Sequence, residues 1–273
     1  MTFKKKQALF LLMICSAQPL VTHAVDWHDT SVGIRWGDNF REPETGDKVT
    51  KTIFNLTHVS GDKWGTNLFV VDLFLSNRSD PSRNGNGARE IYGFYKRSFS
   101  LATLADINFS NTFVKDVSLN ARIDLGRKNS ALSPRPKKLR LGVSADLAVP
   151  IGRMDIGIDA YHERSHNGIV GKDVNFDTTY AIWSTWSFPI YGKSSFEGLI
   201  DHIGPMGKDG FGVKTKPSTM VRLNYIYDIG APGGFKVGVG YQYWRNKHGN
   251  DNKRDSKRGS TENAYTLQLN YHF

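Results

Sequence analysis

The sequence is poor in cysteine and has no long apolar run in its main part. Its 273 residues contain one cysteine, Cys15, and no apolar run after residue 24 reaches the about 18 residues that a membrane helix needs. The first 24 residues are basic over Met1–Lys6, apolar from Ala8 onward, and end on the small residue Ala24. This order is typical of a secretory signal peptide, so we expect residues 1–24 to be removed, leaving a mature chain without an internal disulfide.

Two other interpretations of this N-terminal segment are excluded. A membrane-spanning helix would need a longer apolar run, and Gln18-Pro19 interrupts this one. A lipoprotein anchor on Cys15 would need a small residue before it, where the sequence has Ile14. Removal of the segment takes three lysines with it and lowers the net charge from +10 to about +7, so the mature chain stays basic.

The mean hydropathy of −0.43 does not separate a soluble protein from a membrane barrel. Only alternate residues of a barrel strand face lipid, so the average over the whole chain stays polar. The two classes must instead be distinguished by whether apolar residues recur at every second position along the sequence.

This alternation is clearest in the last stretch of the chain, Glu262–Phe273. Every second residue is apolar or aromatic, and nearly all the others are polar; the apolar set is Tyr265, Leu267, Leu269, Tyr271 and Phe273. A period of two indicates a strand with one apolar and one polar face. The stretch has the length of a tilted membrane strand, and its terminal aromatic residue resembles the closing strand of bacterial outer-membrane barrels.

The same alternation recurs along the mature chain and predicts twelve strands. They cover Ser31–Phe40, Lys51–Val59, Thr66–Ser76, Glu90–Phe99, Val117–Leu125, Leu139–Val149, Met154–Tyr161, Phe176–Phe188, Ser195–Ile203, Thr219–Tyr227, Phe235–Trp244 and Glu262–Phe273. Within Lys51–Val59 the phase is ambiguous. An even number of strands is expected for one bacterial chain, and closure leaves no unpaired edge in lipid. The predicted fold class is all-β, a transmembrane antiparallel up-and-down β-barrel over residues 25–273, in the bacterial outer membrane.

Short and long connections alternate between the predicted strands. The short ones contain Ser60–Lys63, Leu101–Thr103, Pro150–Arg153, Tyr191–Lys193 and Ala231–Gly234. Short turns belong to the periplasmic end of such barrels and long loops to the exterior. The basic excess is placed in two exterior loops, Arg135–Lys138 and Asn252–Arg258, where solvated loops near anionic lipid or lipopolysaccharide head groups are favoured over a nucleic-acid partner.

Several local strings resemble the nucleoside-specific channel-forming outer-membrane proteins, the Tsx and OmpK-type family. They are Asp26-Trp27 followed by Ser31-Val32, Ile53–His58, Gly65–Phe69 followed by Asp72, Asp80-Pro81 with Glu90–Tyr92, Asn167–Gly171 and the Tyr-His-Phe end. The resemblance covers most of the mature chain and is closer to the OmpK-type branch. It implies a monomeric barrel of twelve strands with a narrow pore that passes nucleosides.

The inward phase supplies groups that suit a nucleoside. Bases stack on aromatic rings, and sugar hydroxyls pair with carboxylates and arginine. The candidate pore-lining residues are Arg35, Asp72, Glu90, Tyr92, Phe94, Arg122, Asp124, Arg140, Asp159, Tyr161, Trp183, Glu197, Asp201, Arg222 and Trp244. For each of them a structural role is the alternative: charges can cross-link neighbouring strands, aromatic residues can pack at the rim, and a bulge would turn Trp183 and Trp244 outward.

Other functions fit the sequence less well or as side roles. Tyr161–His166 contains His, Glu and Ser, and His162–His166 matches the string His-Glu-x-x-His. That zinc motif works from a helix, which is not predicted here; alternation sends His162 away from the interior, and Gly-x-Ser-x-Gly does not occur. We therefore expect no enzyme, no cofactor and no metal site. A general small-solute porin, or an adhesin or bacteriophage receptor built on the long loops, remains the alternative to a nucleoside channel.

Overall fold

The computed structural model describes residues 25–43, 46–80, 87–109, 112–230, 234–255, 257 and 259–273. The predicted signal peptide, residues 1–24, lies outside the described residues. So do Pro81, Arg258 and residues 231–233, which held parts of a quoted string, a basic loop and a predicted turn.

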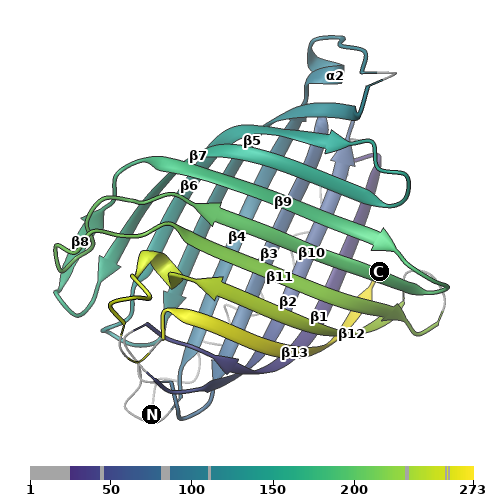
Figure 1. The fold of residues 1–273 in the computed structure, drawn as a ribbon. Helices are drawn as coiled ribbons and strands as arrows, with labels where there is room; N and C mark the ends of the chain where they lie inside the picture. The colour runs from purple at the N-terminus through teal and green to yellow at the C-terminus, as the bar shows by residue number, and fades with distance from the viewer. Residues whose placement is uncertain are drawn as a thin grey trace, which may run out of the picture.

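The described residues form thirteen strands, of which twelve build one closed wall (Figure 1). They are β1 (Trp27–Phe40), β2 (Val49–Asp62), β3 (Gly65–Ser76), β4 (Arg89–Ser100), β5 (Val114–Lys128), β6 (Arg135–Leu147), β7 (Arg153–Asn167), β8 (Lys172–Asn175), β9 (Thr179–Pro189), β10 (Ser194–Ile203), β11 (Ser218–Asp228), β12 (Phe235–Arg245) and β13 (Thr261–His272). β8 pairs only with the end of β7 and adds a short hairpin. The prediction of a twelve-stranded antiparallel barrel is confirmed.

The wall closes where the first strand meets the last. β1 pairs antiparallel with β13 from Ser31 opposite His272 to Asp38 opposite Tyr265, and β6 pairs with β7, which pairs with β9. Every long strand therefore has a neighbour on both sides. In lipid this matters because an unpaired backbone group costs several kcal/mol.

The outer wall is apolar over its full circumference. Side chains of the apolar phase are exposed on every long strand, for example Ile123 (54%), Leu141 (52%) and Leu267 (56%). Exposed tyrosines and phenylalanines such as Tyr271 and Phe273 lie at the ends of this belt, as in membrane barrels. The chain is a multi-pass β-barrel of the outer membrane. Among the described residues no helix has the length and apolar character needed to cross a membrane.

The β2 phase, which the sequence leaves ambiguous, is resolved by packing. Phe54 and Leu56 are exposed on the outer wall. Val49 and Ile53 point inward and pack with Phe40, Ala264 and the partly buried Phe74. A small apolar cluster thus fills part of the interior near the end of β1.

The two ends of the barrel differ as predicted, with the short turns beside the C-terminus and the long loops opposite (Figure 1). One predicted short turn is wrong in length. After β4 the chain forms the helical turn α2 (Leu101–Leu104), which projects from this end, and β5 begins only at Val114. The Ser100 hydroxyl caps α2 by accepting a bond from the Thr103 N–H at 3.2 Å, so a capping residue turned the strand end into helix.

One predicted loop is strand, and one strand is longer than predicted. Arg135–Lys138 opens β6, and β7 continues to Asn167, beyond its predicted end at Tyr161. Charge and Pro136 suggested a loop, yet alternation persists: Lys138 points inward and Lys137 outward. Long cationic side chains are tolerated on a strand that extends beyond the lipid, because water reaches both faces there.

Candidate functional site

Most of the predicted pore-lining residues meet on the inner face of β4–β10. We call this group the lumen cluster: Tyr92, Phe94, Lys96, Arg122, Asp124, Lys138, Arg140, Asp159, Tyr161, Trp183 and Asp201. Their inward direction follows from register, because the opposite phase of each strand is the exposed apolar one.

Asp124 is the centre of one half of the lumen cluster. Its carboxylate is fully buried and accepts bonds from Arg122 Nε at 2.7 Å, from Arg122 Nη2 at 2.9 Å and from the Tyr92 hydroxyl at 2.6 Å. The Arg122 guanidinium also lies 3.8 Å above the Phe94 ring. These contacts link β4 to β5 and hold the arginine flat against an aromatic ring, which adds a cation–π attraction.

The other half crosses the interior rather than following the wall. Arg140 on β6 makes a two-pronged pair with Asp201 on β10, at 2.8 Å for each bond, although β7 and β9 lie between these strands. Lys96 on β4 lies 3.8 Å above the ring of Trp183 on β9, and the indole N–H donates to Asp159 at 2.8 Å. These contacts narrow the interior at this level and brace opposite walls.

The aromatic faces of the lumen cluster are already covered by cations. Besides the pairs on Phe94 and Trp183, Lys138 lies 5.3 Å from the Tyr92 centroid and Arg140 5.1 Å from that of Tyr161. A flat solute must displace a flexible ammonium group or stack on the outer plane of a guanidinium. Both are possible chemically, since bases stack on arginine planes as well as on rings.

The facing wall carries a second, smaller polar group. Arg35 lies 3.6 Å from Asp72, which also accepts from Asn55 Nδ2 at 2.7 Å. Arg222 donates to the Gln242 side-chain oxygen at 3.0 and 2.7 Å. Arg35 therefore has a carboxylate partner, whereas the hydrogen bonds of Arg222 go to a neutral amide oxygen.

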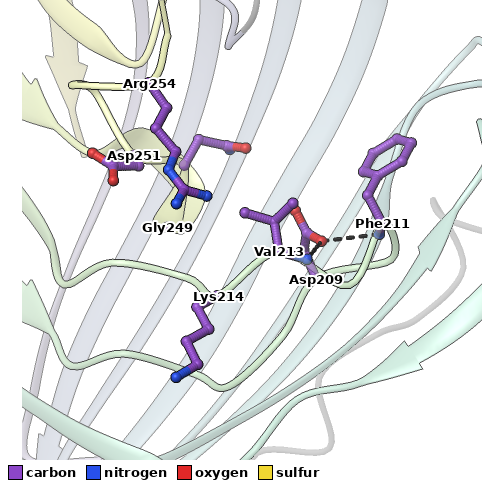
Figure 2. Close-up of a pocket in the computed structure, with 8 residues that line it drawn as sticks. Asp209, Phe211, Val213, Lys214, Gly249, Asp251 and Arg254 are labelled. Atoms are coloured by element: carbon purple, nitrogen blue, oxygen red, sulfur yellow. Dashed lines mark hydrogen bonds between the residues drawn. The ribbon is translucent and has the colours of Figure 1, made fainter.

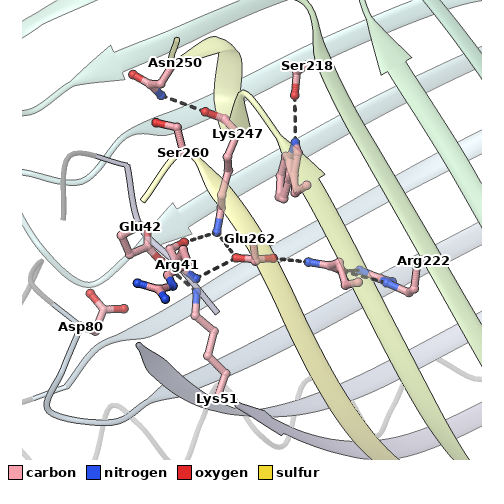
Figure 3. A network of polar contacts seen from close by, with 12 residues as sticks. Arg41, Glu42, Lys51, Asp80, Ser218, Arg222, Lys247, Asn250, Ser260 and Glu262 are labelled. Carbon is pink, nitrogen blue, oxygen red and sulfur yellow. Dashed lines mark hydrogen bonds and ion pairs between the residues drawn. The ribbon is translucent and has the colours of Figure 1, made fainter. Parts of the chain in front are cut away.

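A buried network of polar side chains lies at the loop end of the barrel, which we call the mouth (Figure 3). Lys247, in the short η2 helix (Lys247–Gly249), donates to Glu262 at 2.7 Å and to the Arg41 carbonyl at 2.5 Å. Glu262 also accepts the Arg41 N–H at 2.9 Å and the Gln242 amide at 2.5 Å. The β1–β2 loop and the β12–β13 loop are thereby tied together at the mouth.

Glu42 extends this network to three ammonium groups. It lies 2.9 Å from Lys51 and 3.5 Å from Lys128, and Lys128 in turn pairs with Asp80 at 2.8 Å. Burial alone would raise the pKa of Glu42, but the charges of Lys51, Lys247 and Lys128 outweigh it and hold the pKa well below its usual value. The carboxylate therefore stays ionised at neutral pH.

This depressed pKa predicts an acid-sensitive mouth. Unfolded Glu42 takes up a proton near pH ~4.3, whereas the folded carboxyl does so only at lower pH. Its stabilisation is thus complete above that pH and is lost as pH falls through the folded pKa. We expect the stability advantage of the wild type over Glu42→Gln, measured as thermal unfolding midpoint in detergent, to shrink steadily below pH ~4.3. A constant difference across this range would contradict the ion pairs.

The remaining predicted residues lie apart from the lumen cluster. The Trp244 N–H donates to Ser218 at 2.8 Å beside the mouth network, so Trp244 and Trp183 both point inward as predicted. Glu90 is half-buried opposite Lys128 in register, and Glu197 accepts a bond from Ser195 at 3.0 Å. Whether any of these residues contacts a solute stays a prediction.

The candidate constellation in Tyr161–His166 is not assembled. His162 bonds Thr178 and Asn175 on the outer side, whereas Glu163 accepts from the inward Tyr161 hydroxyl at 2.5 Å. Alternation along β7 separates the base from the carboxylate. Within the described ranges no group of three or more His, Cys, Asp or Glu side chains could hold a metal ion.

Sequence reasoning missed several inward cations and two carboxylates. Lys96 follows Tyr92 and Phe94 in the same phase, and Glu262 belongs to the polar set of the closing strand, so both could have been found by continuing the alternation. Lys247 and Glu42 lie in segments without periodicity, and no sequence signal places them in the mouth.

A cavity of about 370 Å³ opens between the two longest loops (Figure 2). Its lining includes Phe211, Lys214 and Arg254, together with Asp209, whose carboxylate accepts the N–H groups of Phe211 and Val213 at 2.9 Å. Asp209 is engaged in holding its own loop, so the cavity presents an aromatic ring and two cations beside the carboxylate of Asp251, which pairs with Lys216 at 3.7 Å.

The chain was compared with known families, curated proteins and solved structures. No family model matches the sequence, and no curated protein matches it. The structure is similar to the KdgM porin (8% identity, TM-score 0.46, covering 89% of this chain and 99% of that one) and to the NanC porin (12%, 0.49, 88% and 98%). It is also similar to the translocator domain of the autotransporter NalP from Neisseria meningitidis (12%, 0.48, 98% and 95%). At such identities the likeness concerns the fold alone, and the resemblance to nucleoside-specific channels stays a hypothesis.

Proposed function

We propose that this barrel is a passive channel for nucleosides. The observation that carries the proposal is the pairing of rings with charges at one level of the interior: Trp183 bonded to Asp159 at 2.8 Å, and Phe94 beside Arg122 and Asp124. A base can stack at such a place while sugar hydroxyls donate to the carboxylates. The contacts from Arg140 to Asp201 and from Lys96 to Trp183 cross the interior at this level.

The test is conductance of the purified protein in planar bilayers. We expect small single-channel currents that added nucleoside partly blocks, whereas hexoses at equal concentration do not. Binding must be weak for the solute to leave again. Large currents that nucleosides leave unchanged would refute selectivity.

A single tryptophan gives the sharper prediction. Replacing Trp183 by Ala removes a stacking surface worth ~1–3 kcal/mol per base, so we expect the nucleoside concentration for half block to rise roughly five- to a hundredfold. Trp186→Ala is the matched control, since Trp186 lies on the same strand in the opposite, lipid-facing phase beside Phe196. Equal block constants for both variants and the wild type would place the solute elsewhere.

A general small-solute porin is the second candidate. It is favoured by the cations that already cover the rings of Tyr92, Phe94, Tyr161 and Trp183. In that case the same bilayer experiment gives block by neither nucleosides nor sugars, and Trp183→Ala changes only the conductance.

A further inference from the structure

Four neighbouring strands carry outward cations at the loop end of the wall, and three of them turn apolar at the next outward position. Toward the loop end their outward side chains are cationic, and the next outward positions on β4, β5 and β6 are Ile91, Leu125 and Leu139. We call the cations the basic band: Arg89 on β4, Arg127 on β5, Arg135 and Lys137 on β6, and Arg164 on β7.

The outward direction of the band follows from the strand pairing. Lys137 stands opposite Leu125 and Arg164, and Arg127 stands opposite Ile91. Ile91 and Leu125 are 51% and 57% exposed on the lipid-facing wall. The alternate residues, such as Lys138 and Asp124, belong to the lumen cluster.

The band has little negative charge to balance it. Among the described residues, the ion pairs of its members comprise one contact, from Arg164 to Asp173 on β8 at 2.8 Å. The carboxylates of the same strands, Glu90, Asp124 and Glu163, point into the barrel. Arg135 Nε is buried and has no hydrogen-bond acceptor. Neighbouring strands lie about 4.8 Å apart, so these like charges repel one another unless an anion joins them.

The other side of the barrel lacks such a band. At the same end, the outward positions of β1, β2 and β13 carry Asp38, Thr50, Thr52 and Asn263, and Thr50 donates to Asp38 at 2.9 Å. The described outward positions of these three strands therefore carry no cation at this end, and a single one, Arg245, follows on β12. Clustering of cations on β4–β7 is expected of a binding surface rather than of general solubility.

We propose that the basic band binds the phosphate groups of a phosphorylated glycolipid in the outer leaflet. Its position selects this partner: the cations lie at the upper border of the apolar belt, where a lipid head group sits while its acyl chains run along Ile91, Leu125 and Leu139. A juxtamembrane cation attracts anionic lipid over about a Debye length. A soluble anion would gain nothing from the apolar residues below.

The test measures binding of lipid A to the full chain in detergent by native mass spectrometry. Three probes are compared: lipid A with both phosphates, lipid A with both removed, and inorganic phosphate as a competitor. We expect the bis-phosphorylated form to bind the wild type and the R127Q/R135Q/K137Q variant to bind it at least about tenfold more weakly. Lipid A without phosphates should bind both proteins equally weakly.

A control variant removes three cations from the turn end, K63Q/K115Q/K193Q, and should bind as the wild type does. Equal binding by R127Q/R135Q/K137Q and the wild type overturns the proposal, as does equal binding of dephosphorylated lipid A. Full displacement by millimolar phosphate would reveal a free-phosphate site and overturn the lipid assignment. Should the triple variant not fold, K137Q alone, on the exposed face, has to show a severalfold loss. Bilayer conductance should be the same in all variants, which separates this outcome from that of the channel proposal.

Discussion

Replacing Glu262 by Ala is expected to lower the free energy of unfolding by about 3–5 kcal/mol, the range found when one partner of a buried ion pair is removed. The side chain is fully buried, and both of its oxygens are in use: one accepts from Lys247 and the Arg41 N–H, the other from Gln242. Its loss leaves the Lys247 ammonium 5% exposed without its carboxylate. The loss of stability is measured as a drop in the temperature at which the barrel loses its compact form on gels.

Two further variants distinguish charge from packing at this site. Glu197→Ala removes an inward carboxylate that is held by the Ser195 hydroxyl, and we expect a loss nearer ~1 kcal/mol. The double variant Lys247→Met with Glu262→Met replaces the pair by apolar groups and should recover much of the stability, because the unpaired charge is gone. If Glu262→Ala melts like the wild type, the loops are not tied at the mouth as described.

Replacing Arg140 by Ala is expected to destabilise the barrel by a similar ~3–5 kcal/mol and to raise its single-channel conductance. Arg140 is 4% and Asp201 17% exposed, and their two-pronged pair joins strands that are not neighbours. The substitution removes a brace and most of a large side chain from the interior. Chemical unfolding in micelles gives the first quantity and bilayer recordings give the second.

Arg153→Ala is the matched control for this pair. Arg153 also bonds a carboxylate, Asp155 at 3.0 Å, but its side chain is 53% exposed, so its loss should cost no more than ~1 kcal/mol. In a double-mutant cycle, Arg140→Ala and Asp201→Ala should be strongly coupled. Additive effects would show that the two side chains do not meet in the folded barrel.

Alternation along the sequence was enough to predict the fold and the inward or outward direction of most side chains. The inward placement of Trp183 and Trp244 follows from a period of two, because a strand that keeps one face in lipid cannot slip by one residue. The sequence could not predict which side chains pair across the interior. That Arg140 meets Asp201, or Lys96 meets Trp183, depends on the tilt and stagger of the strands, and a single-strand pattern contains neither quantity.

Composition gave a wrong prediction where it disagreed with the two-residue period of the apolar side chains. Arg135–Lys138 has the proline and charges of a loop, yet it forms the start of β6 because its neighbours β5 and β7 extend equally far. The helical turn α2 shows the reverse case, in which the local cap at Ser100 ended a strand pattern. The positions of loop side chains such as Lys247 and Glu42 are fixed by contacts with residues far away in the sequence. The local sequence does not predict such contacts.

The seam between β1 and β13 has a consequence for biogenesis. Asp29 and His272, which contact each other across it, are 243 residues apart, so the barrel cannot close until β13 has been made. Until then two strand edges remain unpaired, and pairing at such a separation is slow. A change that keeps β13 from pairing therefore leaves two open edges, so closure of the whole wall depends on this one strand.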